Sequence, residues 1–79
     1  MSTADKVRSA LEAVAKAPIP ADDDASLFDA GVVDSFGLME FIGELEREFG
    51  VKVPDDELTP RKFETVAKVA AWFDARKRG

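Results

Sequence analysis

A chain of 79 residues without cysteine or histidine has room for one small domain, with no disulfide or thiolate–metal site to stabilise it. The lack of histidine also removes the commonest general base and metal ligand. A net charge of −5 disfavours binding to nucleic acid and to anionic membranes and favours partners with basic surfaces. The hydrophobic content of 46 % is sufficient for a helical core and too high for a disordered chain.

The first predicted helix covers about residues 3–17. Its apolar residues recur at helical spacing on one face: Val7, Ala10, Leu11 and Val14. Ser2 or Thr3 can cap its start, and Pro18 cannot continue a helix. A membrane-surface anchor is the alternative for this amphipathic segment, but valine, leucine and alanine alone make a weak apolar face. The first residues are too polar for a secretory signal and no apolar run reaches membrane-spanning length, so we expect a soluble cytoplasmic protein.

A long connection follows, over residues 18–33. Its acidic cluster, Asp22-Asp23-Asp24, lacks the alternating ligands, the glycine and the distal glutamate of a calcium-binding loop. We therefore interpret the cluster as solvated loop residues with helix-capping capacity. Four apolar residues should fasten the connection to the helices: Leu27, Phe28, Val32 and Val33. Because long loops in small domains usually pack through their own side chains or carry function, we expect this one to present the residue that follows it.

The second predicted helix, Ser35–Phe49, has clear start and stop signals. Asp34 is a preferred N-cap, because its carboxylate accepts the free N–H groups of the first turn. Ser35 then lies at the surface and at the positive end of the helix dipole, where a negatively charged group is favoured. The apolar positions form one buried stripe: Leu38, Phe41, Ile42, Leu45 and Phe49. Gly50 ends the helix.

The chain after this helix predicts shorter elements. Val51 and Val53, in an extended link, are expected to be buried. Residues 55–58 indicate a short third helix or turn, whose acidic residues suit a helix N-terminus. Thr59-Pro60 interrupts it, and residues 61–63 can form a further turn.

A last helix is expected over Val66–Arg76, with Thr65 as its N-cap. Its buried face holds four residues: Val66, Val69, Ala70 and Phe73. The spacing leaves Trp72 either at the edge of the core or exposed. The sequence as a whole predicts an all-α single domain over residues 1–79, a small four-helix bundle with three main helices and a short third helix.

The residues of this chain do not form an obvious catalytic or metal centre. Ser35 has no histidine to activate it, and no glycine-rich phosphate loop is present. No pair of carboxylates is framed by apolar residues that would shift a pKa for acid–base work. Independent catalysis and metal binding are therefore not expected. From local chemistry alone, Ser35 can be explained as a helix-start residue that supplements Asp34.

Five features occur together where the second helix begins: Asp34, Ser35, Phe36, Glu40 and the acidic run of residues 44–49 that ends in phenylalanine. With the preceding residues 27–33, they resemble the modification site of the acyl and peptidyl carrier proteins. That family has an Asp-Ser-hydrophobic motif at the start of its second helix, a glutamate five residues after the serine, and an acidic run ending in phenylalanine. The resemblance covers about residues 26–73.

The resemblance implies an acyl-carrier-protein-like fold and a covalent cofactor, 4′-phosphopantetheine, on Ser35. A phosphopantetheinyl transferase would attach it from coenzyme A, and its thiol would hold an acyl or aminoacyl group as a thioester. The sulfur would thus come from the cofactor in a chain without cysteine. Further implied partners are an acyl- or aminoacyl-activating ligase and a downstream acyltransferase or synthase. The resemblance also implies that Asp34 assists binding of the transferase, and we expect a monomer.

Partner contacts are expected beside Ser35. Phe36 and Met39 lie off the core stripe, and exposed aromatic and methionine residues are typical of contact surfaces. The alternative is that one of the two folds back under the preceding loop. Glu40 and Glu44 belong, with Glu48, to an acidic ridge that is either a solvated face or a surface for basic residues of partner enzymes.

The sequence departs from the family in places. Phe36 stands where leucine or methionine is more usual, and Gly37 and Gly43 put two flexible residues into the second helix, each costing about 1 kcal/mol against alanine. Residues 27–35 are more similar to stand-alone aminoacyl carriers of the D-alanyl type than to fatty-acid carriers. An unmodified helical interaction module and a fatty-acyl or polyketide carrier remain the alternatives.

Overall fold

The computed structural model describes residues 2–76, which contain three α-helices and two short 3₁₀ segments. The elements in chain order are α1 (Thr3–Glu12), α2 (Ser35–Phe49), η1 (Asp55–Glu57), η2 (Pro60–Phe63) and α3 (Val66–Arg76). The all-helical prediction is confirmed for this part of the chain. The finer prediction of a four-helix bundle is not confirmed, because the expected short third helix is present as 3₁₀ turns.

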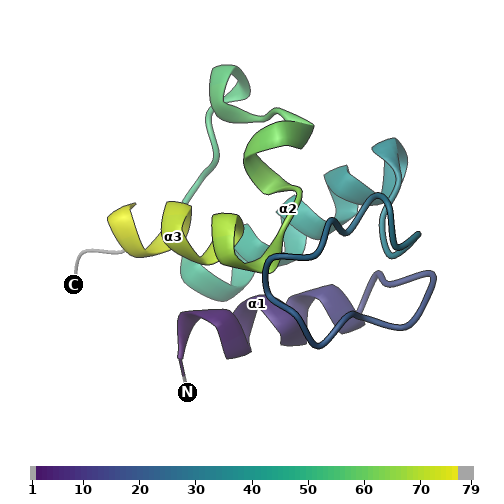
Figure 1. Cartoon of the computed structure of the whole chain (residues 1–79). Coiled ribbons are helices and arrows are strands. Elements are labelled where there is room, and N and C mark those ends of the chain that lie inside the picture. Colours follow the sequence, from purple (N-terminus) through teal and green to yellow (C-terminus); the bar gives the residue numbers. More distant parts are fainter. Residues whose placement is uncertain (1, 77–79) are drawn as a thin grey trace.

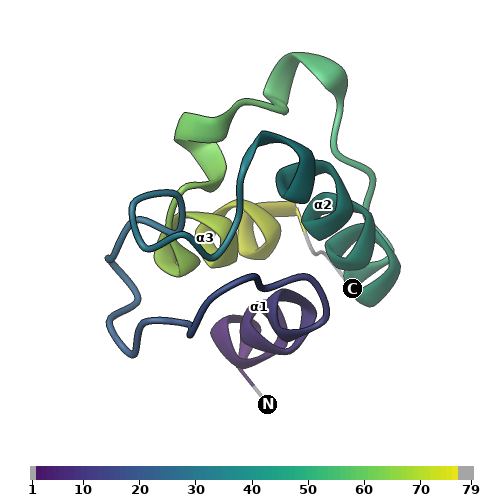
Figure 2. The ribbon, with the colours of Figure 1, turned by 90° about the vertical axis from the view of Figure 1, so that its right-hand side faces the viewer.

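The three α-helices pack around one core. In Figure 1, α1 runs opposite to α2 and α3, and Figure 2 shows η1 and η2 on the far side of α2 and α3 from α1. The C-terminal ends of α2 and α3 meet where the rings of Phe49 and Phe73 stack with centroids 4.7 Å apart. The largest fully buried side chains come from all three helices, the long connection and η2: Phe41, Phe63, Phe73, Leu11, Leu27, Leu45, Val7, Val32, Val66 and Val69.

The prediction for the first helix was right at its start and wrong at its end. Ser2 caps it in a reciprocal arrangement with Asp5, but the helix stops at Glu12 rather than near residue 17. The N–H of Lys16, which in a longer helix would donate to the carbonyl of Glu12, donates instead to the carbonyl of Val32 at 3.0 Å. A contact distant in sequence therefore ends the helix before the prolines do.

The connection between α1 and α2 is fastened to the helices at several points. Leu27, Val32 and Val33 are buried and Phe28 is partly buried, as their apolar character predicted. The guanidinium of Arg8 donates to the carbonyl oxygens of Pro20 and Ala21, at 2.8 and 3.0 Å, and to the carboxylate of Asp23. Backbone hydrogen bonds from Leu27 to Glu64 and from Ala67 to Asp23 complete the attachment. Asp23 thus anchors the loop, while Asp22 and Asp24 are exposed, as expected for solvated loop residues.

The C-terminal part agrees with the predicted pattern. α3 has the expected bounds, and Thr65 caps it by accepting the N–H of Lys68 at 3.0 Å. Trp72 is buried at the edge of the core, with 8 % of its surface exposed. Val53 is buried, whereas Val51 is only partly so. Within residues 2–76, none of the helices is both long and apolar enough to span a bilayer.

Candidate functional site

The candidate site is the N-terminus of α2, where the long connection ends. Asp34 has extended backbone dihedrals and its Oδ1 accepts the N–H of Gly37 at 2.6 Å, which makes it the N-cap of the helix. Ser35, the first helical residue, is exposed. No hydrogen bond joins its side chain to another group in the described part of the chain. The predicted placement of a solvent-facing hydroxyl at the positive end of a helix is therefore confirmed.

Asp34 is electrostatically supported by two neighbours. The pKa of its carboxyl is held below the ordinary value, chiefly because the Gly37 N–H donates to the ionised form and also because of the Lys16 ammonium. Lys16 Nζ lies 3.7 Å from Asp34 Oδ2. The sequence did not predict Lys16 at this site. Its backbone N–H donates to the carbonyl of Val32, and this contact between residues distant in sequence brings Lys16 close to α2. Nothing in the local sequence around position 16 indicates this contact.

Gly37 allows Asp34 to lie close to the helix. A Cβ at position 37 would come 3.2 Å from Asp34 Oδ1 and 3.7 Å from Lys16 Cε. The glycine is buried, in contrast to Gly43, where a Cβ would meet no atom within 4 Å. The helix-weakening residue at position 37 therefore has a packing reason, and the one at position 43 has none in the described chain.

The residues predicted to contact partners lie on the outer face of α2. Phe36 is 84 % exposed and Met39 is 56 % exposed, so the alternative that one of them folds under the loop was wrong. Glu40 is exposed, while Glu44 is half-buried and pairs with Arg47 at 3.2 Å. A hollow of about 390 Å³ beside these glutamates is lined by residues of α2 and of the segment after α1: Ala13, Val14, Glu40, Gly43, Glu44 and Arg47. Three of the six lining residues are charged, so the space is not a purely apolar cleft.

Comparison with known proteins identifies the family. A family model described as the phosphopantetheine attachment site matches residues 5–73. The chain belongs to this family. It is 38 % identical over 69 residues to the D-alanyl carrier protein of Streptococcus uberis, and the aligned residues make up 87 % of each chain.

Other relatives match over shorter spans. The chain is 42 % identical over 48 residues to D-alanyl carrier protein 2 of Lactiplantibacillus plantarum, which covers 61 % of this chain and 60 % of that protein. It is 50 % identical over 46 residues to the D-alanyl carrier protein of Streptococcus pyogenes serotype M5, which covers 58 % of each. The chain thus spans about three fifths of the length of these two relatives. The expected resemblance to carriers, and to the stand-alone aminoacyl type among them, is confirmed.

Proposed function

We propose that this chain, as one carrier domain over residues 1–79, bears 4′-phosphopantetheine on Ser35 and presents an aminoacyl or acyl thioester on it to partner enzymes. The observation that supports this most is the exposure of Ser35 at the start of α2, in a family whose members carry a phosphopantetheine attachment site. The hydroxyl oxygens of Ser2 and Ser26 are already engaged, since they accept the backbone N–H groups of Asp5 and Asp29.

The residues around Ser35 suit a phosphodiester. The first turn of α2 carries no carboxylate, so the new negative charge would meet the positive end of the helix without a repelling side chain in that turn. The negative charge of Asp34 is offset by Lys16. When bound, the group supplies the thiol that a chain without cysteine lacks. No histidine is present to deprotonate the hydroxyl, and we propose that the modifying transferase supplies the base.

The cargo that we propose is an aminoacyl group. The relatives named above are D-alanyl carrier proteins, and the matched segments extend over 58–87 % of this chain. The hollow beside α2 is lined by Glu40, Glu44 and Arg47, an environment suited to short polar cargo rather than to a sequestered acyl chain. A fatty-acyl or polyketide cargo is the alternative within the family.

We further propose that chemistry resides in the partners and that this chain is not itself an enzyme. A phosphopantetheinyl transferase would modify Ser35, an aminoacyl- or acyl-activating ligase would load the thiol, and a downstream acyltransferase or synthase would accept the cargo. Phe36, Met39, Glu40 and Glu44 would contact these enzymes. The proposal includes a monomeric, cytoplasmic protein and a carrier fold in which the short 3₁₀ segments stand in place of the third of four helices.

Intact-mass spectrometry tests the proposal. The chain is incubated with coenzyme A, magnesium and a phosphopantetheinyl transferase, and we expect a gain equal to a single phosphopantetheine group. Ser35→Ala should abolish the gain, whereas Ser9→Ala, at an exposed serine within α1, should leave it intact. No gain in the unchanged chain, or a gain that persists in Ser35→Ala, would defeat the proposal. Loading of the modified chain by ligases for amino acids and for fatty acids then identifies the cargo.

A further inference from the structure

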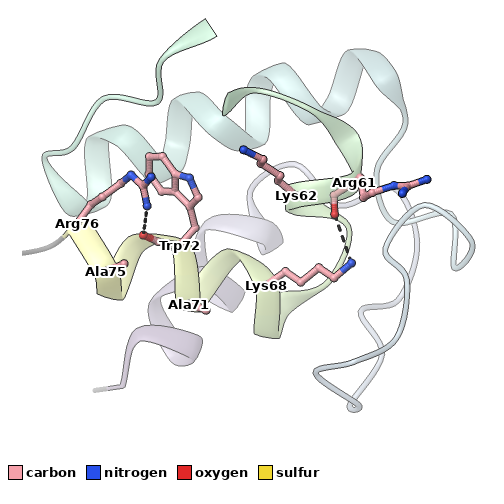
Figure 3. A pocket seen from close by; sticks show the side chains of 7 residues that line it. All are labelled: Arg61, Lys62, Lys68, Ala71, Trp72, Ala75 and Arg76. Atoms are coloured by element: carbon pink, nitrogen blue, oxygen red, sulfur yellow. Dashed lines mark hydrogen bonds between the residues drawn. The ribbon is translucent and has the colours of Figure 1, made fainter. Parts of the chain in front are cut away.

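A second surface, separate from the Ser35 face, is formed by α3 and η2. A hollow of about 470 Å³ is lined there by Arg61, Lys62, Lys68, Ala71, Trp72, Ala75 and Arg76, and we call it the basic groove. Figure 3 shows Arg61 and Lys68 at one end of it and Arg76 at the other. Ala71 and Ala75 leave the space above α3 open, because their side chains end at Cβ.

The floor of the groove is held rigidly. The Trp72 ring packs against Phe73, with centroids 4.8 Å apart, and its Nε1–H donates to Glu57 Oε1 at 3.2 Å. The guanidinium of Arg76 lies over the same ring, 4.0 Å from its centroid. The ring is 8 % exposed, so the apolar part of the groove that a ligand can reach consists mainly of the exposed Ala71 and Ala75, beside a cation held in place by Trp72.

The charge of the groove is opposite to that of the whole chain. Its four cations are accompanied by two carboxylates: Lys62 pairs with Glu57 at 2.8 Å, and Lys68 pairs with Glu64 at 2.7 Å. Arg76 makes only long contacts, from Nη2 to Glu57 Oε1 at 3.8 Å and from Nη1 to the Trp72 carbonyl at 3.4 Å, so its charge is weakly compensated. The local excess of positive charge in a protein of net charge −5 favours an acidic ligand at this place.

We propose that the basic groove docks an acidic segment of a protein partner, in which apolar side chains that enter the hollow are flanked by carboxylates. An apolar residue would rest on Ala71, Ala75 and the exposed edge of Trp72, and the flanking carboxylates would meet Arg61 and Lys68 at one end and Arg76 at the other. A bilayer fits less well, because the large exposed apolar residues of the described chain, Phe36 and Met39, belong to α2 and not to the groove. The surface does not involve Ser35, so a partner could remain bound there while the attachment site is in use.

Binding is measured with an N-acetylated, C-amidated peptide of sequence Glu-Asp-Leu-Leu-Asp-Glu. Trp72 is the sole tryptophan, so its emission reports occupancy of the groove. We expect saturable changes in that emission and in backbone amide shifts of residues 61–76, and little change near Ser35. The neutral peptide Gln-Asn-Leu-Leu-Asn-Gln should bind much more weakly.

Variants of the chain separate the effect of the groove on binding from the effect of net charge. The double change Arg61→Gln and Lys68→Gln should weaken peptide binding about tenfold, because each exposed ion pair contributes a few-fold to the affinity and two such pairs are lost. The matched pair Arg47→Gln and Lys52→Gln removes the same charge from exposed positions elsewhere and should have little effect. Ala71→Leu should prevent binding by filling the hollow without a change of charge.

Several results would overturn the proposal. These are no saturable binding, equal binding of the neutral peptide, or an equal loss in the two double variants. Phosphatidylglycerol vesicles that shift Trp72 emission more than the peptide does would make the groove a membrane contact. A concentration-dependent dimer that Ala71→Leu dissociates would make it a self-association surface. Because each measurement can be made in Ser35→Ala, its outcome is independent of the function proposed for Ser35.

Discussion

Asp34 stabilises the start of α2 in its ionised form. Its Oδ1 accepts the Gly37 N–H at 2.6 Å and its Oδ2 lies 3.7 Å from the Lys16 ammonium. Both contacts favour the carboxylate over the carboxylic acid, so the pKa of Asp34 in the folded chain is below that in the unfolded chain. The same charge then contributes to stability in a pH-dependent way.

The pH dependence can be isolated with Asp34→Asn, because asparagine is also a good N-cap and carries no charge. The unchanged chain should be the more stable at neutral pH. Since the folded pKa is lowered, this advantage should be complete above the unfolded value of about 3.9 and should be lost as the pH falls through the folded pKa. Urea unfolding of both proteins between pH 2 and pH 7 measures it. A stability difference that persists unchanged at the acid end would contradict this account.

Phe36 and Met39 are the exposed large apolar residues of the described chain, and both flank Ser35. The double change Phe36→Ala and Met39→Ala should alter the free energy of unfolding by less than about 0.5 kcal/mol, because neither side chain packs in the core. It should raise the KM of the phosphopantetheinyl transferase about tenfold, as loss of an apolar contact predicts. The control Ser9→Ala changes an exposed residue of α1 and should leave KM unchanged. An unaltered KM in the double variant would remove these residues from the contact surface.

Among the elements, α2 and α3 were predictable to the residue, because caps and apolar spacing lie within each segment. The end of α1 was not, since residues 13–16 suit a helix and the hydrogen bond that diverts them, from the Lys16 N–H to the Val32 carbonyl, joins residues distant in sequence. For the same reason, the sequence did not predict that Lys16 lies close to Asp34. The N-cap of α2 and the exposure of Ser35 were predictable from local signals, whereas the contact between Lys16 and Asp34 required the tertiary structure.

The two glycines of α2 give an element-scale prediction. Gly43→Ala should stabilise the chain by about 1 kcal/mol, because a Cβ there meets nothing within 4 Å and alanine is the better helix former. Gly37→Ala should gain much less or lose stability, because its Cβ would crowd Asp34 Oδ1 at 3.2 Å. Thermal unfolding of the two variants compares them directly. An equal gain at both positions would show that the Asp34 carboxylate moves aside without cost.

At the scale of the whole molecule, the chain separates its charges between two surfaces. α2 carries the exposed Glu40 near Phe36 and the exposed Glu48 near its C-terminal end, whereas the basic groove lies on α3 and η2. The long connection joins the two regions, since Leu27 and Asp23 hydrogen-bond to the segment around α3 and the connection ends at Asp34. The position of Ser35 therefore depends on contacts that span the molecule.

Arg8 is the side chain that ties α1 to this connection, and its removal tests that dependence. Arg8→Ala should lower the free energy of unfolding by about 1–2 kcal/mol, because it removes charged hydrogen bonds to Pro20, Ala21 and Asp23. Hydrogen exchange should accelerate at the Leu27 and Ala67 amides, which fasten the same connection.

The matched control for this change is Arg47→Ala, on an exposed arginine whose side chain, among residues 2–76, pairs with Glu44 alone. It should change stability by less than about 0.5 kcal/mol and leave both amides protected. If Arg8→Ala is as mild as Arg47→Ala, burial of Leu27, Val32 and Val33 is enough to hold the connection. If instead Arg8→Ala accelerates exchange at Leu27 and also slows modification of Ser35, the arginine on α1 helps to hold the attachment serine in place, because the connection that it anchors leads directly into α2.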